Sequence, residues 1–147
     1  MVNEIVVCLD GSSFAEAILP YARGIARSLK ARLALLRIID REEEFSAARK
    51  YLQGFARRYD ADAQVRMKET DAASAIVAEL RQKAFALAAM TTHGHSGMLE
   101  ALVGSVAFSV VRGAGRPLLL YRPPAHGFKA DPDAEIKIAS VVATLDG

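Results

Sequence analysis

Three short apolar runs constrain the fold of this 147-residue chain more than any other feature. They occupy residues 5–9, 33–39 and 85–90, and Arg37 is their only charged member. A strand with one face in water alternates apolar and polar residues, whereas a strand covered on both faces is apolar throughout. The runs therefore predict buried strands of a mainly parallel sheet with helices on both of its faces.

Helical patterns separate these runs. Apolar residues recur at helical spacing over residues 14–29 and again over residues 45–59. Because proline has no N–H to donate, Pro20 predicts a kink or weakened first turns in the first of these helices. Asp71 or Ser74 can cap a third helix, which carries the apolar residues that follow.

The remaining segments complete the alternation of strands and helices. Residues 63–67 alternate apolar and polar side chains, which predicts a half-exposed third strand at an edge of the sheet. A helix is predicted over residues 105–112, ending at Gly113. The last strand is predicted over residues 117–121, with proline at its first position, where it disturbs pairing least.

This order of elements predicts a doubly wound α/β fold with a five-stranded, mainly parallel sheet in the order 3-2-1-4-5. Strands one, two and four are the most uniformly apolar, so strands one and four are placed side by side at the centre. Ligands of such sheets bind beyond the carboxyl ends of the strands, where the strand order reverses. Asp10 and Gly94, which follow strands one and four, are then expected to meet at one crevice.

Composition and charge argue against several classes of function. The formal net charge is +2 and the basic residues are scattered along the chain, which gives no footprint for nucleic acid. No apolar stretch approaches the roughly 18 residues of a membrane span, and the N-terminus lacks the basic region of a signal peptide. The single cysteine, Cys8, excludes an internal disulfide and suits a reducing compartment. These features predict a cytoplasmic protein with no membrane partner.

A candidate anion site follows the fourth predicted strand. Thr91-Thr92-His93-Gly94 stands there, and nine residues separate Gly94 from Gly104-Ser105, where the next helix opens. The N-terminus of a helix presents unpaired N–H groups and the positive end of its dipole, so it favours a phosphate. The alternative is that Gly94 only shapes a turn and that Ser105 only caps its helix.

The last residues of the chain repeat the first ones. Residues 123–135 hold prolines, acids and few apolar side chains, and they are predicted to be a linker after a domain over residues 1–122. Residues 141–147 end in Leu-Asp-Gly, as do residues 5–11, so residues 136–147 are predicted to be the first strand of a second repeat. That strand would add to a sheet edge, unless the similarity arose by chance.

Together these motifs resemble the universal stress protein family over residues 2–122. The segments that carry the resemblance are the first strand and its Asp-Gly-Ser turn (5–12), the second strand (33–39), and the signature loop, helix and last strand (90–97, 104–106 and 116–120). The resemblance implies a five-stranded parallel α/β fold that is usually dimeric. A homodimer or a tandem-domain partner is therefore expected, with residues 118–121 as a pairing edge.

The resemblance also implies a nucleotide, because one branch of the family binds ATP through a glycine loop. In that loop two residues separate the first two glycines, and nine residues separate the second from a third glycine followed by serine or threonine. Gly94, Gly104 and Ser105 match this pattern, whereas Thr91 occupies the position of the first glycine. A β-branched threonine resists positive φ and adds bulk, so Thr91 opposes the implied ATP binding.

The resemblance further implies which residues would contact ATP, with or without Mg²⁺. Asp10 would hydrogen-bond the adenine or the ribose, although the same carboxylate can serve only as a helix cap. Ile38 would offer its backbone to adenine. The implied nucleotide-binding residues are Asp10, Ile38, Met90, Thr91, His93, Gly94, Gly104, Ser105 and Val106.

Three functions follow from these observations. The first is a stress-response or regulatory module that binds ATP in the crevice between strands one and four. The second is a structural or dimerisation module of a tandem universal stress protein that does not bind ATP, as Thr91 favours. The third is an enzyme acting on a phosphorylated substrate, which only the crevice, His93 and His95 favour. No catalytic residue is predicted, and any ATP hydrolysis would be slow.

Overall fold

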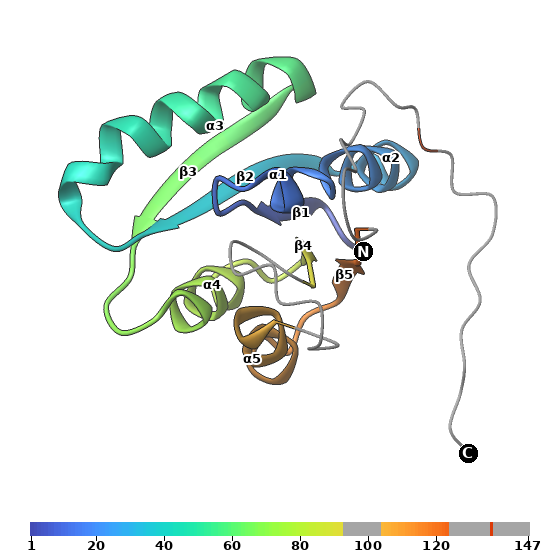
Figure 1. Ribbon diagram of the computed structural model, residues 1–147. Helices are drawn as coiled ribbons and strands as arrows, with labels where there is room; N and C mark the ends of the chain where they lie inside the picture. The colour runs from blue at the N-terminus through green and yellow to red at the C-terminus, as the bar shows by residue number, and fades with distance from the viewer. Residues whose placement is uncertain (93–103, 124–135, 137–147) are drawn as a thin grey trace.

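The computed structural model describes residues 1–92, 104–123 and 136 (Figure 1). The strands are β1 (Glu4–Cys8), β2 (Arg32–Ile39), β3 (Ala61–Met67), β4 (Ala86–Thr91) and β5 (Leu118–Tyr121). The helices are α1 (Ser13–Glu16), α2 (Leu19–Leu29), α3 (Phe45–Tyr59), α4 (Ala72–Arg81) and α5 (Ser105–Gly113), with a short 3-10 helix η1 (Glu42–Glu44) before α3.

The five strands form one parallel sheet in the order β3-β2-β1-β4-β5, which confirms the predicted order and the predicted fold class. β1 is the central strand and pairs with both β2 and β4, so that Val6 stands opposite Ala34 on one side and Ala88 on the other. The strand order therefore reverses between β1 and β4, where a ligand crevice is expected in this class of fold.

The side chains of β1 alternate between two hydrophobic cores, one on each face of the sheet. Ile5 and Val7 pack with α1, α2 and α3, whereas Val6 and Cys8 pack with α4 and α5. Figure 1 shows the same two helical layers, with the sheet between them. Each fully buried valine, leucine or isoleucine contributes roughly 1.5–3 kcal/mol, so burial on both faces explains why the central strands are apolar throughout.

The edge prediction for β3 is confirmed. β3 is the outer strand beyond β2, and of its seven residues only Val65 is buried. The helix predicted over residues 45–59 is α3, and its buried residues Ala48 and Leu52 face the sheet. Asp71, one of the two predicted caps, begins α4: its carboxylate accepts the N–H of Ser74 at 2.8 Å.

The helical pattern of residues 14–29 divides into two helices. α1 ends at Glu16, and α2 begins at Leu19 with Pro20 in its first turn. A proline costs little there because the first N–H groups of a helix have no intrahelical partner. The predicted kink is therefore a break in front of Pro20, and the apolar periodicity continues across it because both helices cover the same face of the sheet.

Two of the predictions fall on segments that the structure does not describe. Apart from Pro123 and Ile136, the predicted linker (residues 123–135) and the predicted second-repeat strand (residues 136–147) lie outside the described residues. The division into these segments stays a prediction. Within residues 1–92 and 104–123, every helix is too short or too polar to cross a membrane.

Candidate functional site

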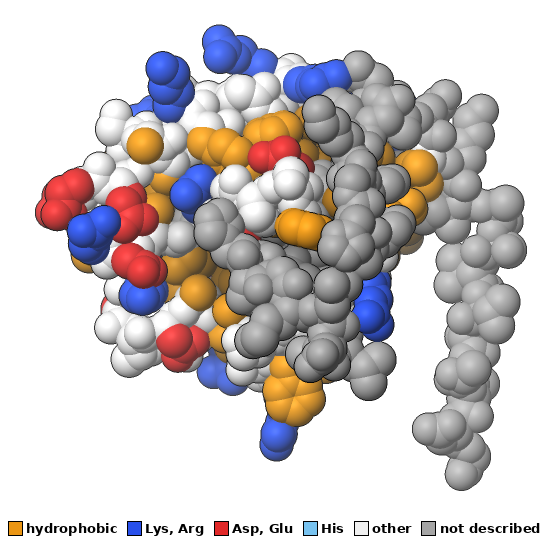
Figure 2. All heavy atoms as spheres, in the orientation of Figure 1, with side chains coloured by type: hydrophobic (Ala, Val, Ile, Leu, Met, Phe, Trp, Pro, Cys, Tyr) orange, Lys and Arg blue, Asp and Glu red, His pale blue; other side chains and the backbone are white. Residues whose placement is uncertain are grey.

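A pocket of about 320 Å³ lies beyond the carboxyl ends of β1 and β4, on the side of the sheet that α4 and α5 cover. We call it the β1–β4 pocket. Asp10, which follows β1, and Ser105, which begins α5, both line it, and the pocket lies where the strand order reverses. Gly94, which the sequence also places at this crevice, lies outside the described residues. Figure 2 shows this end of the molecule, where the visible Lys and Arg side chains are scattered and do not gather into one patch.

Asp10 stands at the mouth of the pocket, in the turn that joins β1 to α1. Its Oδ1 atom accepts the backbone N–H of Ser12 at 2.9 Å and the hydroxyl of Ser12 at 2.6 Å. Ser12 in turn accepts the N–H of Ala15 at 3.1 Å and is the cap of α1. Asp10 itself is therefore not the helix cap. It holds the capping serine, and its exposed carboxylate is fixed at the pocket.

Gly11 and Arg37 shape the same turn from its outer side. Gly11 has φ +88°, a conformation that glycine adopts without strain. A β-carbon on Gly11 would lie 2.7 Å from the Nη1 atom of Arg37, so this guanidinium packs against the turn. Arg37 also lies over the ring of Tyr51, at 5.0 Å from its centroid. The β1–α1 turn thus rests on a side chain from β2, which holds Asp10 in position.

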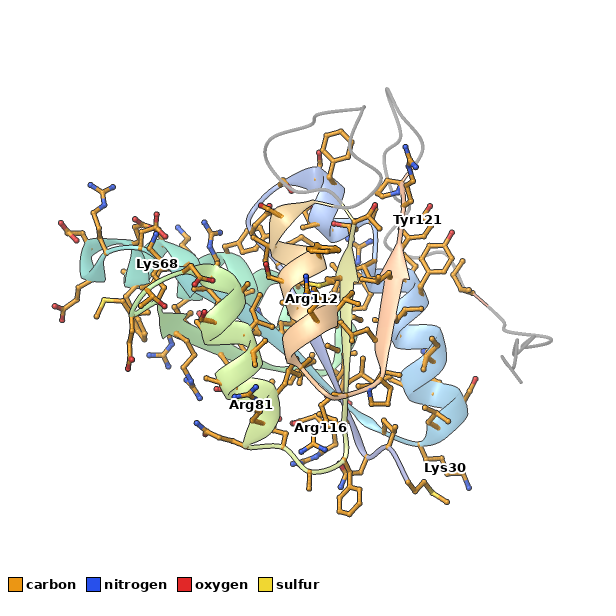
Figure 3. All side chains as sticks on the ribbon, turned by 90° about the horizontal axis from the view of Figure 1, so that it is seen from below. Lys30, Lys68, Arg81, Arg112, Arg116 and Tyr121 are labelled. Carbon is orange, nitrogen blue, oxygen red and sulfur yellow. The ribbon has the colours of Figure 1, made fainter. Side chains whose placement is uncertain are left out.

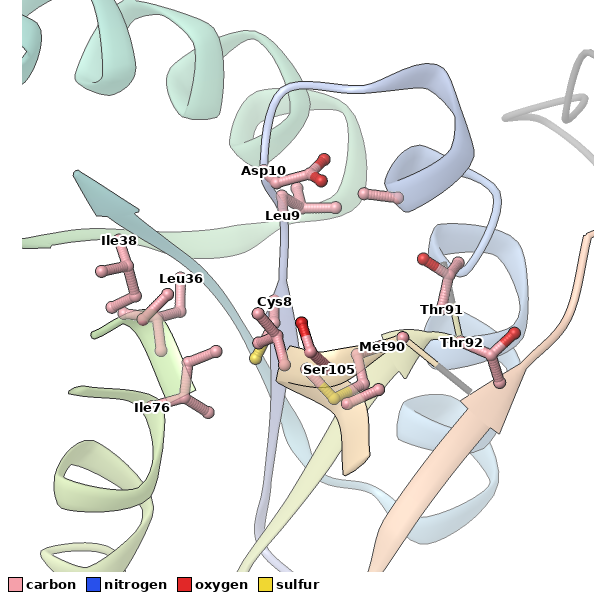
Figure 4. Close-up of a pocket in the computed structure, with 15 residues that line it drawn as sticks. Cys8, Leu9, Asp10, Leu36, Ile38, Ile76, Met90, Thr91, Thr92 and Ser105 are labelled. Carbon is pink, nitrogen blue, oxygen red and sulfur yellow. The ribbon is translucent and has the colours of Figure 1, made fainter. Parts of the chain in front are cut away.

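One wall of the pocket is apolar. Leu36 and Ile38 from β2, Ile76 from α4, and Cys8 and Met90 at the ends of β1 and β4 line it (Figure 4). These strand residues share one face of the sheet because side chains alternate along a strand. An apolar wall beside a few convergent polar groups is the usual composition of a small-molecule site, and a flat aromatic base can lie against it.

The opposite side of the pocket carries hydroxyl groups and the start of α5. Thr91, Thr92 and Ser105 line the pocket there (Figure 4). The residue before α5 is Gly104, and no side chain caps this helix, in contrast to α1 and α4. The first N–H groups of α5 therefore have neither an intrahelical partner nor a side-chain cap, and they form a favourable place for an anion.

Thr91 ends β4 in extended conformation, and positive φ is confined to other residues of the described chain. The threonine is therefore unstrained, and its backbone does not require glycine. Thr91 is buried and is among the residues that line the pocket, so its size is the objection that remains. Of the two objections that the sequence raises against Thr91, the structure removes the one based on φ and retains the one based on size.

The pocket gathers seven of the nine residues that the resemblance implies: Asp10, Ile38, Met90, Thr91, Gly104, Ser105 and Val106. His93 and Gly94 lie outside the described residues. The sequence predicts no site role for Leu36 and Ile76. The side-chain alternation along β2 could have indicated Leu36, which shares a face with Ile38. No signal in the sequence indicates Ile76, because the rotation of α4 against the sheet decides which of its residues face the pocket.

Asp10 is the only charged side chain among the described residues that line the pocket. The described lining therefore offers a phosphate amide and hydroxyl groups, and neither a lysine nor an arginine. Within the described part of the chain, no three His, Cys, Asp or Glu side chains stand together as a metal site. The polar groups that line the pocket suit the sugar, the base and one end of a phosphate, and the described ones do not form a metal site.

Cys8 gives a prediction about pH. Burial raises the pKa of its thiol from 9.0 to about 12. Above pH 9 the thiol of the unfolded chain loses its proton, whereas the thiol of the folded chain keeps it. The stability that the raised pKa of Cys8 contributes is therefore complete below pH 9 and is lost by pH 12. The free energy of unfolding should fall by about 1.4 kcal/mol per pH unit in that range. Urea denaturation of the wild type and of Cys8→Ala at pH 8 and 10.5 measures it, and equal pH dependence in both proteins would contradict this expectation.

The comparisons with known proteins agree with this geometry. The sequence profile described as the universal stress protein family matches residues 40–122, which is more than half of the chain. No curated protein matches the sequence. Many solved structures share the fold, and among them is a universal stress protein from Lactobacillus plantarum. It has a TM-score of 0.71 and 18% identity, over 82% of this chain and 97% of that chain.

Two other similar structures hold adenine nucleotides. A universal stress protein from Archaeoglobus fulgidus, in complex with dAMP, has a TM-score of 0.60 and 15% identity, over 82% of this chain and 97% of that chain. A protein of the same family from Arabidopsis thaliana, with AMP bound, has a TM-score of 0.60 and 15% identity, over 90% of this chain and 99% of that chain. At these identities the likeness concerns the fold.

Proposed function

The chain belongs to the universal stress protein family, and on this premise we propose that it is a stress-response module that binds an adenine nucleotide, ATP in particular, in the β1–β4 pocket. One observation carries the proposal. A fixed carboxylate, an apolar wall and an uncapped helix N-terminus surround a single pocket of about 320 Å³. Two structures of the same fold hold dAMP and AMP, which supports an adenine nucleotide as the ligand.

In this proposal the adenosine part of the ligand occupies the apolar side of the pocket. The base lies against Leu36, Ile38 and Ile76, and the backbone of Ile38 meets its edge. Asp10 accepts a hydrogen bond from the ribose hydroxyls or the amino group, for which its fixed orientation is suited. Because the turn around Asp10 is held before the ligand arrives, little ordering cost falls on binding.

The phosphates in this proposal meet the start of α5. The N–H groups of Ser105 and Val106 and the hydroxyl of Ser105 hold phosphate oxygens beside the positive end of the helix dipole. Since no cationic side chain of the described residues lines this pocket, the charge on a triphosphate is only partly offset. Mg²⁺ would arrive with ATP and be held mainly by the phosphates. We place the protein in the cytoplasm, which suits a buried free thiol.

Calorimetry with Thr91→Gly tests the proposal and the role of threonine bulk. The wild type should bind AMP and ATP saturably, with one nucleotide per chain. Removing the buried Thr91 side chain should tighten ATP binding by about tenfold, which corresponds to about 1.4 kcal/mol. Thr92→Gly is the matched comparison, because Thr92 is also a buried threonine that lines the pocket, but it does not occupy the motif position.

Two outcomes of this titration would contradict the proposal. The absence of heat and of a thermal shift with millimolar AMP and ATP would exclude nucleotide binding by the wild-type chain. Equal changes in ATP affinity in Thr91→Gly and Thr92→Gly would show that threonine bulk at the motif position is not what limits the ligand.

A second candidate function is a dimerisation module without a nucleotide. β5 is the outer strand beyond β4, and Leu120 on this strand is exposed. An apolar strand at a sheet edge is suited to pairing with another chain. A chain that sediments as a dimer and fails to bind AMP and ATP would favour this function. A chain that binds nucleotide as a monomer would contradict it.

A further inference from the structure

A second pocket, of about 560 Å³, lies at the opposite end of the sheet from the β1–β4 pocket. We call it the basic pocket. It is formed where α2 and α3 end and where β2 and β3 begin, so two separate parts of the chain contribute to it. Figure 3 shows Lys30 at this end of α2, away from the carboxyl ends of β4 and β5. The cationic residues that line it are Arg23, Arg27, Lys30, Arg32 and Arg58.

The charge of the basic pocket is unbalanced. Five cationic and two anionic side chains line it, which leaves an excess of three positive charges. The two acids are Asp60 and Asp62, which are both exposed. Like charges gathered in a concave surface raise the local potential and attract anions. The formal charge of the entire chain is only +2, so the basic pocket is a local concentration of charge.

The helix dipoles account for only part of this cluster. Cations near the last turn of a helix are stabilised by the negative end of its dipole, which explains Arg27 in α2 and Arg58 in α3. Arg23 lies in the middle of α2, and Arg32 begins β2, so the dipole gives no reason for either. The helix dipoles therefore do not account for the complete set of cations in the basic pocket.

Arg23 is also held in place. Its guanidinium lies 5.5 Å from the centroid of the Tyr59 ring, a cation–π contact with a buried aromatic residue. Within the part of the chain that the structure describes, the acidic partner of Arg32 is distant: its Nη2 atom is 3.9 Å from Glu4, and its side chain is 73% exposed. One cation is thus oriented before a ligand binds, and the other is available at the rim.

We propose that the basic pocket binds a compact oligophosphate: a chain of linked phosphoryl groups, either as free inorganic polyphosphate or as the tail of a nucleotide. Four of its five cations are arginines, whose planar forks match phosphate oxygens and bind them in pairs. Cations spread around a pocket of about 560 Å³ suit several phosphoryl groups better than a single one. The concave shape suits a small ligand better than the convex surface of a nucleic-acid duplex.

Calorimetric titration of the full chain with inorganic tripolyphosphate tests this inference. We expect saturable binding of one tripolyphosphate per chain, which weakens as salt is added. The double variant Lys30→Gln/Arg32→Gln should weaken it by about tenfold or more, because hydrogen bonds to charged groups are among the strongest that a site offers. Both side chains are exposed, so the fold should tolerate these changes.

The control is Arg49→Gln/Lys50→Gln, which removes the same charge from an exposed part of α3 outside the basic pocket. It should bind tripolyphosphate as the wild type does. Saturating AMP should not displace tripolyphosphate. ATP should displace it if the basic pocket also accepts the phosphate tail of a nucleotide. If ATP does not displace it, the ligand is free polyphosphate. Absence of saturable binding, equal weakening in both double variants, or tighter binding of a DNA duplex at the same residues would overturn the proposal.

Discussion

Replacing Ala72 with phenylalanine is expected to abolish nucleotide binding and to leave the protein folded. Ala72 begins α4, is only partly buried and lines the β1–β4 pocket beside Ile76. A phenyl ring at this position would fill the space that the base needs. The expected loss of affinity for AMP is about 100-fold or more, equivalent to about 3 kcal/mol, and calorimetry measures it directly.

Ala78→Phe is the matched control for this substitution. Ala78 lies on the same helix but is exposed and outside the pocket. Both variants carry the same loss of helix propensity, about 0.5 kcal/mol, so a difference in AMP affinity between them reflects the pocket alone. If Ala72→Phe binds AMP as well as Ala78→Phe does, the nucleotide lies somewhere other than the β1–β4 pocket.

Replacing Lys83 with methionine is expected to destabilise the fold far more than the removal of an exposed charge does. The Nζ atom of Lys83 lies 2.8 Å from Oε2 of Glu4 and 3.6 Å from Oε1 of Glu79, and both carboxylates are buried. Among the described residues, Glu79 keeps Arg66 at 3.0 Å, but Glu4 keeps only Arg32 at 3.9 Å. Leaving a buried carboxylate almost unpaired should lower the free energy of unfolding by about 3 kcal/mol.

Denaturation of Lys83→Met and Lys68→Met by urea tests this expectation. Lys68 pairs with Asp40 at 2.9 Å, but those side chains are 33% and 64% exposed. An exposed pair contributes about 0.5 kcal/mol, so the Lys68→Met variant should unfold almost as the wild type does. The double variant Glu4→Gln/Lys83→Met should regain part of the loss, because the uncompensated charge is gone. Equal destabilisation by the two single variants would contradict the role given to burial.

The strands and their order could be predicted from the sequence because burial on both faces leaves a direct signature in composition. The runs over residues 5–9 and 33–39 are apolar because helices cover both sides of β1 and β2. The break before Pro20 could not be placed in the same way. The apolar pattern of residues 14–29 continues through it, since α1 and α2 pack on the same core.

The β1–β4 pocket was partly predictable for a topological reason. Once β1 and β4 are neighbours, Asp10 and Ser105 must come close, because the carboxyl ends of parallel strands meet at one edge. The capping role of Ser12 was not predicted, because Asp10 and Ser12 are both good capping residues and only the hydrogen bonds distinguish them. The contribution of Ile76 depends on how α4 is rotated, which is decided by packing.

The basic pocket and the buried ion pairs illustrate what the sequence cannot show. Basic residues that are scattered along the chain, such as Arg23, Arg32 and Arg58, come together only when the ends of α2 and α3 meet the start of β2. Glu4 and Lys83 are far apart in the chain, and their pairing depends on the placement of β1 beside β4. Such contacts follow from the tertiary fold and leave no local pattern.

A crystal structure of the chain with an adenine nucleotide tests the central claim most directly. We expect the base against Leu36, Ile38 and Ile76, the carboxylate of Asp10 within hydrogen-bond distance of the ribose or the base, and the first phosphate at the amides that open α5. A nucleotide bound elsewhere, or an empty β1–β4 pocket in crystals grown with millimolar nucleotide, would contradict the claim.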